Sequence, residues 1–133
     1  MNYFKKDGYI HELTKEAKAL RFKVETTISA ETVENIIVNS LEGASAYWVG
    51  IDNTTPEWDA APHELPVSQY ATQLLLEGKS IKLYDIEDEE EQWELDLQML
   101  LRGIGKAMSE GYDIEDDTDE VLQLALFGEL VYG

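Results

Sequence analysis

The stretch SAETVENIIVNSLEGASAYWVG, residues 29–50, carries the clearest helix signal in the chain. Ser29 is suited to cap a helix, because its hydroxyl can accept a hydrogen bond from a free N–H group of the first turn. Apolar residues then recur at steps of three and four, which places them on one helix face. They are Val33, Ile36, Ile37, Leu41 and Ala44. We expect a core helix over residues 30–43 that Gly43 ends in the left-handed conformation.

An aromatic pair, Tyr47 and Trp48, follows this helix, and residues 49–51 continue in a near-extended pattern. This pair has two interpretations, and in the first it closes one end of the core. In the second it forms an exposed surface that stacks on a ligand. We expect the pair to face the proline-rich loop over residues 52–66, which contains Trp58. Tyr47, Trp48 and Trp58 are therefore the candidate lining of a small-ligand pocket.

Patterns elsewhere in the chain predict an α+β fold in one domain over residues 1–133. Residues 20–28 alternate apolar and polar side chains, which is typical of a half-buried strand. Two more extended stretches, 80–86 and 91–96, predict an antiparallel hairpin whose connection at 87–90 lacks the usual glycine. These three stretches form the predicted antiparallel sheet. The four helices expected to pack against it are at 30–43, 67–77, 97–110 and 118–127.

Particular residues are predicted to begin or bend the last two helices. Asp96 is expected to cap the third helix, while Asp117 and Glu120 have the spacing of a capping box for the fourth. Gly103 and Gly105 weaken the third helix pattern. We expect them to allow another element to pack closely.

The beginning of the chain carries no strong structural or targeting signal. Residues 1–19 are weakly periodic and predict a loosely ordered arm, with TKEAKA at 14–19 as a short helix in the alternative. The first thirteen residues lack the continuous apolar run of a signal peptide. No run approaches the roughly 18 apolar residues of a membrane span. We therefore expect a cytoplasmic protein that does not bind membranes.

The chain is strongly acidic, with a formal net charge of −18 that is unevenly distributed. Residues 1–23 hold six of the ten Lys and Arg residues against three acidic ones, a local charge of +3 that leaves −21 for the remainder. Nucleic acid and anionic membranes repel such a body, whereas basic protein surfaces attract it. The alternative is that the acidic surface only keeps the protein soluble.

Two clusters concentrate this negative charge. Eight of the twelve residues from Asp85 to Asp96 are acidic, and seven more lie between Glu110 and Glu120. If both clusters share one surface, their carboxylates would imitate a phosphate backbone and compete for grooves lined by lysine and arginine. The candidate partner-binding residues are Asp85, Glu87, Asp88, Glu89, Glu90, Glu91, Asp113, Glu115, Asp116 and Asp117.

Residue types that form common catalytic and metal sites are scarce. The chain has no cysteine, and its two histidines, His11 and His63, have no zinc-binding spacing. Alternate acids over 113–119 resemble the first half of a calcium loop. However, Thr118 stands where glycine is required and Leu124 where the final glutamate is required. We therefore predict no catalytic residue, no cofactor and no metal site, and expect a protein that is not an enzyme.

Three blocks of sequence carry a resemblance: TVENIIVNSLEGASAYWVG at 32–50, SIKLYDIEDEEEQWELDLQMLLRGI at 80–104 and LALFGELVYG at 124–133. Together, and in this order, they resemble a group of small acidic proteins of phages and prophages of Gram-positive bacteria. The resemblance covers about residues 20–133. It implies a setting rather than an activity, and it identifies no catalytic residues. Accessory phage proteins of this size often bind host or phage proteins, including host defence systems.

These observations favour a non-enzymatic accessory protein that binds a basic protein. One form of this hypothesis is a nucleic-acid mimic that inhibits a host defence system or a nucleic-acid enzyme. Two alternatives belong to other classes. The first is a small-ligand binder that uses the aromatic pocket, and the second is a structural or assembly accessory that works as a homo-oligomer.

Overall fold

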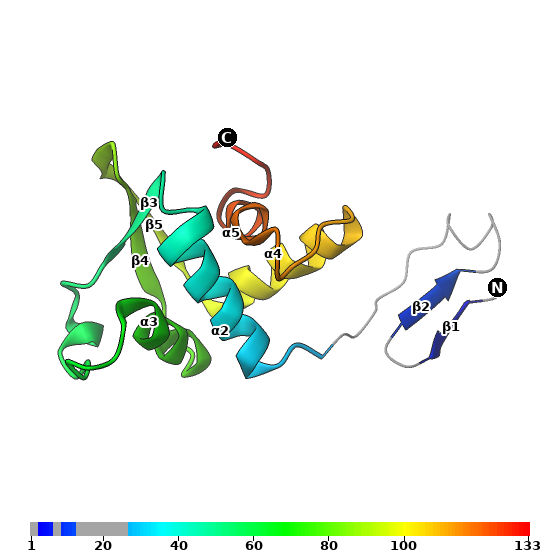
Figure 1. The fold of residues 1–133 in the computed structure, drawn as a ribbon, viewed down its shortest axis with the longest axis horizontal. Helices are drawn as coiled ribbons and strands as arrows, with labels where there is room; N and C mark the ends of the chain where they lie inside the picture. The colour runs from blue at the N-terminus through cyan, green and yellow to red at the C-terminus, as the bar shows by residue number, and fades with distance from the viewer. Residues whose placement is uncertain (1–2, 7–8, 13–26) are drawn as a thin grey trace.

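The computed structural model describes residues 3–6, 9–12 and 27–133, and Figure 1 shows how its elements are arranged. After residue 26 its helices and strands are α2 (Ala30–Asn39), β3 (Val49–Asp52), α3 (Val67–Leu76), β4 (Ile81–Asp85), β5 (Asp88–Leu95), α4 (Leu97–Ser109) and α5 (Thr118–Phe127). A π-helical turn, Ser40–Ala44, continues α2, and a 3-10 turn, Pro56–Trp58, lies in the proline-rich loop. No helix described here has the length and apolar character needed to cross a membrane.

An antiparallel hairpin near the N-terminus pairs β1 (Tyr3–Lys6) with β2 (Tyr9–Glu12). The sequence analysis predicted no strand in this region, where it expected an arm over residues 1–19. The alternative short helix over 14–19 lies outside the described residues.

The α+β class and the three-stranded antiparallel sheet are confirmed, but one of the predicted strands is wrong. The sheet has the order β3–β4–β5. Its third strand is therefore β3, which the sequence showed only as a near-extended pattern. Thr27 and Ile28 have no strand structure, and the rest of the predicted strand at 20–28 lies outside the described residues.

The hairpin of β4 and β5 is confirmed, with a tighter connection than predicted. Strand β5 begins at Asp88, not at residue 91, and the turn comprises Ile86 and Glu87. The carboxylate of Asp85 accepts a hydrogen bond from the backbone N–H of Glu87 at 2.8 Å. A short acidic side chain thus closes the turn by bonding to the backbone two residues on, and no glycine is needed.

The four predicted helices are confirmed, and two of the predicted caps form. Ser29 accepts a hydrogen bond from the N–H of Thr32 at 3.1 Å, and Asp96 accepts one from the N–H of Met99 at 2.8 Å. The prediction for Gly43 is wrong, because α2 continues through it as the π-helical turn.

Ser40 accounts for this continuation of α2. Its hydroxyl donates to the carbonyl oxygens of Ile36 and Ile37 at 2.7 and 3.2 Å, and its own carbonyl accepts from the N–H of Ser45 at 2.7 Å. Back-bonding of this kind disturbs the regular helical ladder and widens it locally. The described glycines with a positive φ lie after the later helices, at Gly78, Gly111 and Gly128.

One apolar core joins the sheet and the four helices. Figure 1 shows β3, β4 and β5 on one side, α4 and α5 on the other, and α2 between them. Val33, Ile36 and Ile37 of α2 are at most 3% exposed, so the predicted apolar face is the buried one. Directly paired residues of antiparallel strands point to the same face of a sheet. The inner face therefore carries Leu83 and Trp93, which are paired in the β4–β5 register.

Helices α4 and α5 pack closely at Gly103, as the sequence analysis predicted. A Cβ atom on Gly103 would lie 2.6 Å from the Cβ of Ala125 and 2.7 Å from its backbone N and Cα, so only glycine fits. The same prediction is wrong for Gly105, where an added Cβ would meet nothing within 4 Å.

These two glycines of α4 provide a matched test of the packing. Gly103→Ala is expected to lower the free energy of unfolding by about 1–3 kcal/mol, because the backbone of Ala125 has no room to move aside. Gly105→Ala adds the same methyl group in open space. It should raise the free energy of unfolding by up to about 1 kcal/mol through better helix propensity. Urea denaturation of both variants measures the difference, and effects of equal sign and size would contradict the close contact.

Candidate functional site at the acidic hairpin

The turn between β4 and β5 carries the first predicted acidic cluster, which we call the acidic hairpin (residues 85–91). Five of its acidic side chains are exposed, Asp85 being the half-buried exception. Asp85 and Asp88 accept hydrogen bonds from backbone N–H groups within the hairpin and so hold its shape. The one salt bridge in the described part of the chain joins Lys79 to Glu77, so no described cation neutralises the hairpin.

The base of the acidic hairpin is tied to the C-terminal segment. The hydroxyl of Tyr132 donates to Asp85 Oδ2 at 2.6 Å. Burial and the neighbouring Asp85 carboxylate raise the pKa of Tyr132 to about 12. The same hydrogen bond, followed by one from the N–H of Glu87, lowers the pKa of Asp85. Each group therefore favours the protonation state that keeps the bond.

The second predicted cluster, in the loop between α4 and α5, is folded on itself. Asp113 Oδ1 accepts from the N–H groups of Glu115 and Asp116 at 3.0 and 3.2 Å, and Asp117 Oδ2 accepts from the N–H of Asp113 at 2.9 Å. Asp117 stands at the N-cap position of α5, but its side chain turns back into the loop. The predicted capping box of Asp117 and Glu120 is therefore wrong.

The structure does not bring the two acidic clusters together. Figure 1 shows the turn of β4 and β5 and the loop between α4 and α5 at opposite ends of the part formed by residues 27–133. A partner that contacts the acidic hairpin meets the carboxylates of this one cluster.

The three predicted pocket aromatics do not form a common pocket, because Tyr47 and Trp48 both bond to Asp119 whereas Trp58 packs on Tyr70. Trp48 is 2% exposed, and its ring stacks on that of Tyr132 with centroids 4.4 Å apart and an interplanar angle of 10°. It faces α5 and the C-terminal segment, so the predicted junction with the proline-rich loop is wrong. Trp58 is buried against Tyr70, with ring centroids 5.2 Å apart, and fixes that loop to the core. Tyr47 is half exposed.

Asp119 joins the segment around Tyr47 and Trp48 to α5, and it was not among the predicted site residues. Its Oδ1 accepts hydrogen bonds from Ser45 Oγ and Trp48 Nε1, both at 2.8 Å. Its Oδ2 accepts from the hydroxyl of Tyr47 at 2.9 Å and from Gln123 Nε2 at 3.1 Å. One carboxylate thus receives four donors and fixes the segment after α2 to the first turn of α5.

Gln123 performs a similar function for the C-terminal segment. It is 1% exposed, and its Oε1 accepts from the N–H groups of Val131 and Tyr132 at 2.7 and 2.8 Å. Its Nε2 also donates to the carbonyl oxygen of Tyr132 at 3.0 Å. A polar residue within a nearly apolar helix was the available sequence signal, since a buried amide needs partners.

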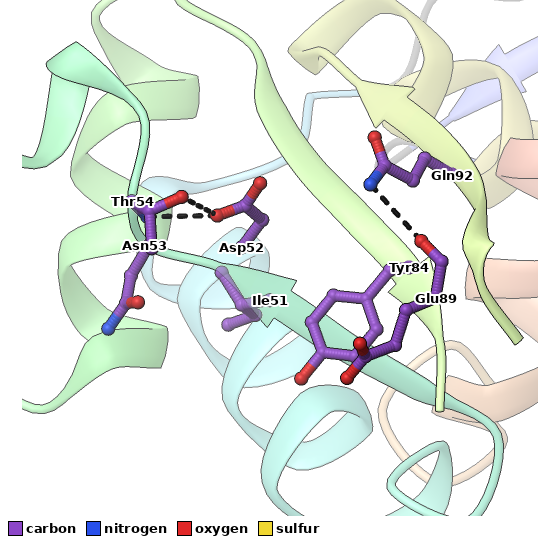
Figure 2. Close-up of a pocket in the computed structure, with 7 residues that line it drawn as sticks. All are labelled: Ile51, Asp52, Asn53, Thr54, Tyr84, Glu89 and Gln92. Atoms are coloured by element: carbon purple, nitrogen blue, oxygen red, sulfur yellow. Dashed lines mark hydrogen bonds between the residues drawn. The ribbon is translucent and has the colours of Figure 1, made fainter. Parts of the chain in front are cut away.

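An open pocket of about 310 Å³ lies on the outer face of the sheet, beside the acidic hairpin (Figure 2). Tyr84, Glu89 and Gln92 lie on one side of it. Residues 52–54 lie on the other. Tyr84 is paired with Gly50 across the two strands, and a Cβ on Gly50 would lie 2.6 Å from Tyr84 Cζ. Glycine at position 50 therefore allows the ring to lie across β3.

Polar contacts set the two walls of this pocket. Asp52 Oδ1 accepts from the hydroxyl and the N–H of Thr54 at 2.5 and 2.9 Å, and these bonds lower the pKa of Asp52. Gln92 Nε2 donates to the carbonyl oxygen of Glu89 at 3.2 Å, and no described residue donates to its amide oxygen. Of the lining residues, only Glu89 was among the predicted site residues, because it belongs to an acidic cluster and the others form no motif in the sequence.

Comparison with known proteins returns no family model, no curated protein and no solved structure that matches this chain. The phage setting therefore stays a prediction. Across the described residues, no group of three or more His, Asp or Glu side chains is placed to hold a metal ion. The fold and surface define the class instead: an α+β protein that presents an acidic hairpin beside an open pocket.

Asp119→Asn tests the fourfold contact. The substituted amide keeps the shape but places an NH₂ group against two donors, and each unmatched buried donor costs about 1–3 kcal/mol. We expect the free energy of unfolding to fall by about 2–4 kcal/mol on this basis. Asp116→Asn removes the same charge from an exposed loop position and should change it by less than about 0.5 kcal/mol. Urea denaturation compares the two, and equal losses would show that charge alone matters.

Tyr132→Phe tests the bond between the C-terminal segment and the acidic hairpin. The folded-state pKa of Tyr132 is raised from 10.0 to about 12, so its contribution to stability is complete below pH 10 and is lost as the pH rises toward 12. The pKa of Asp85 is lowered from 3.8, so its contribution is present above pH 3.8 and is lost as the pH falls below it. The stability difference between wild type and variant should therefore shrink at both extremes in denaturation curves measured across pH. A difference independent of pH would contradict the bond.

Proposed function

We propose that this protein is a non-enzymatic accessory protein of phage or prophage origin that binds a basic protein in the host cytoplasm. The acidic hairpin is its binding element. The observation that supports this proposal is the set of exposed carboxylates at one end of the molecule, held on the β4–β5 strand pair and without a salt bridge to any described cation. A basic surface would supply the missing counter-charges and would be guided to the hairpin by long-range attraction.

The partner class that we propose is a protein that normally binds nucleic acid. Four consecutive acids, Asp88 to Glu91, lie in β5. The strand is irregular at Glu89 to Glu91, because Tyr84 pairs with Gln92 whereas the next residue of β4, Asp85, pairs with Asp88. The hairpin therefore concentrates four carboxylates in one short exposed segment, a density of negative charge of the kind that nucleic-acid-binding grooves attract, without needing the second acidic cluster. Binding in a groove lined by lysine and arginine would exclude the nucleic acid and inhibit the enzyme or defence protein.

An inhibition assay with two matched triple variants tests this proposal. DNA cleavage by a panel of bacterial restriction enzymes is measured as a function of the concentration of each protein, at low and at moderate salt. The hairpin variant carries Glu87→Gln, Glu90→Gln and Glu91→Gln. The control variant loses the same charge from the other end of the molecule through Glu110→Gln, Glu115→Gln and Asp116→Asn.

We expect the wild type and the control variant to inhibit at least one enzyme. The hairpin variant should inhibit that enzyme at least about tenfold more weakly. Three exposed contacts of roughly 0.5 kcal/mol each account for that factor. Added salt should weaken inhibition, because ions screen exposed charges. Absence of inhibition across the panel, inhibition that salt does not change, or equal loss in both variants would overturn the proposal.

A further inference from the structure

The pocket of Figure 2 has one aromatic wall and a floor of sheet backbone, and it opens to solvent beside the acidic hairpin. Gly50 is the reason that the aromatic wall exists, because any larger residue would push the ring of Tyr84 off β3. The volume, about 310 Å³, is at the lower end of the range for ligand sites and suits one long side chain rather than a whole small molecule.

The chemistry of the lining is that of a hydrogen-bond acceptor. Among the described lining residues there is no Lys, Arg or His. Asp52 uses Oδ1 for Thr54, which leaves Oδ2 without a hydrogen bond to any described residue. The amide oxygen of Gln92 and the carboxylate of Glu89 are likewise unbonded within the described part of the chain. The pocket therefore offers three acceptors around an aromatic ring.

A lysine of the protein itself does not fill this pocket. Lys82 lies opposite Asp52 in the strand register, and its charge makes a small contribution to the lowered pKa of Asp52 after the Thr54 hydrogen bonds, but no salt bridge joins the two side chains. The side chain of Lys82 instead lines a neighbouring pocket of about 220 Å³ together with Glu57 and Glu94. The acceptors around Tyr84 are therefore available to a donor from another molecule.

We propose that this pocket receives one arginine side chain of the partner, with the guanidinium plane against the ring of Tyr84 and its N–H groups directed at Asp52, Glu89 and Gln92. This inference rests on the proposed function, because the basic partner supplies the arginine. Guanidinium matches the site better than ammonium does. It is planar, stacks on aromatic faces and has five donors in a fixed fork, whereas lysine offers a compact, strongly hydrated charge.

Peptide titrations of the full-length protein, followed by ¹⁵N NMR, test the inference without a known partner. The probes are three blocked tripeptides, Gly-Arg-Gly, Gly-Lys-Gly and Gly-citrulline-Gly, of which the last has the shape of arginine without its charge. The arginine peptide should shift the backbone amides of Gly50 and Thr54 and the side-chain amide of Gln92. We expect the citrulline peptide to bind at least about tenfold more weakly than the arginine peptide, because citrulline cannot form charge-assisted hydrogen bonds. The lysine peptide should also bind more weakly than the arginine peptide.

Two glycine variants provide the matched control for the aromatic wall. Gly50→Ala displaces the ring of Tyr84 and is expected to weaken arginine-peptide binding about tenfold, the loss of one stacked cation contact. Gly43→Ala adds the same methyl group where nothing lies within 4 Å and should leave binding unchanged. Tyr84→Leu keeps an apolar side chain at the same position without a ring. It therefore tests the stacking even if Gly50→Ala disturbs β3.

Several results would overturn the assignment: equal binding of the citrulline or lysine peptide, shifts spread along the acidic hairpin but not at the pocket, or unchanged binding in Tyr84→Leu. The peptide titration and the enzyme assay fail independently. Inhibition without pocket binding would overturn this inference alone. Arginine binding in the pocket without inhibition of any enzyme would overturn the proposed function alone.

Discussion

The carboxylate of Asp119 is the contact on which the arrangement of the core depends. Its four donors come from the segment that follows α2 and from α5, so it joins parts of the chain more than seventy residues apart. The indole N–H of Trp48 is one of these donors, and burial of that ring would otherwise leave the N–H without a partner, at a cost of about 1–3 kcal/mol. Once Trp48 is held, Tyr132 stacks on its ring, and Gln123 holds the backbone on which Tyr132 lies.

The strand register links the candidate site to this core. On β4, Leu83 points into the core and Tyr84 points to the outer face, since successive side chains of a strand alternate. On β5, Trp93 and Gln92 are divided in the same way. Tyr84 and Gln92, two outward residues of the pocket, are thus each adjacent in sequence to a residue of the inner face. A shift of one residue in the register would exchange the two sets, so the burial of Leu83 and the partial burial of Trp93 also fix the positions of Tyr84 and Gln92.

Local patterns predicted the parts of the structure that depend on near neighbours in sequence. The four helices, the caps at Ser29 and Asp96, and the hairpin of β4 and β5 all belong to this group, because capping and periodicity act over a few residues. The predictions failed where a distant contact decides the outcome. Strand β3 is only four residues long, and its pairing with β4 is what makes it a strand.

The site was predictable to a similar extent. Charge density alone identified the acidic hairpin, whereas the pocket depends on Gly50 lying opposite Tyr84, a pairing that no spacing in the sequence reveals. The prediction of an aromatic pocket at Trp48 was wrong, because the indole N–H of Trp48 bonds to Asp119 within the protein. Nothing in the sequence distinguishes Asp119 from the other acidic residues, of which the chain has 28 in all.

The position of β5 at the edge of an open sheet has a consequence for self-association. An edge strand presents unpaired backbone N–H and C=O groups that can pair with the edge of another copy. Here the first four residues of that edge are all acidic, so two copies aligned edge to edge would place like charges against each other. Repulsion between these charges would therefore oppose edge-to-edge pairing of two copies of this protein.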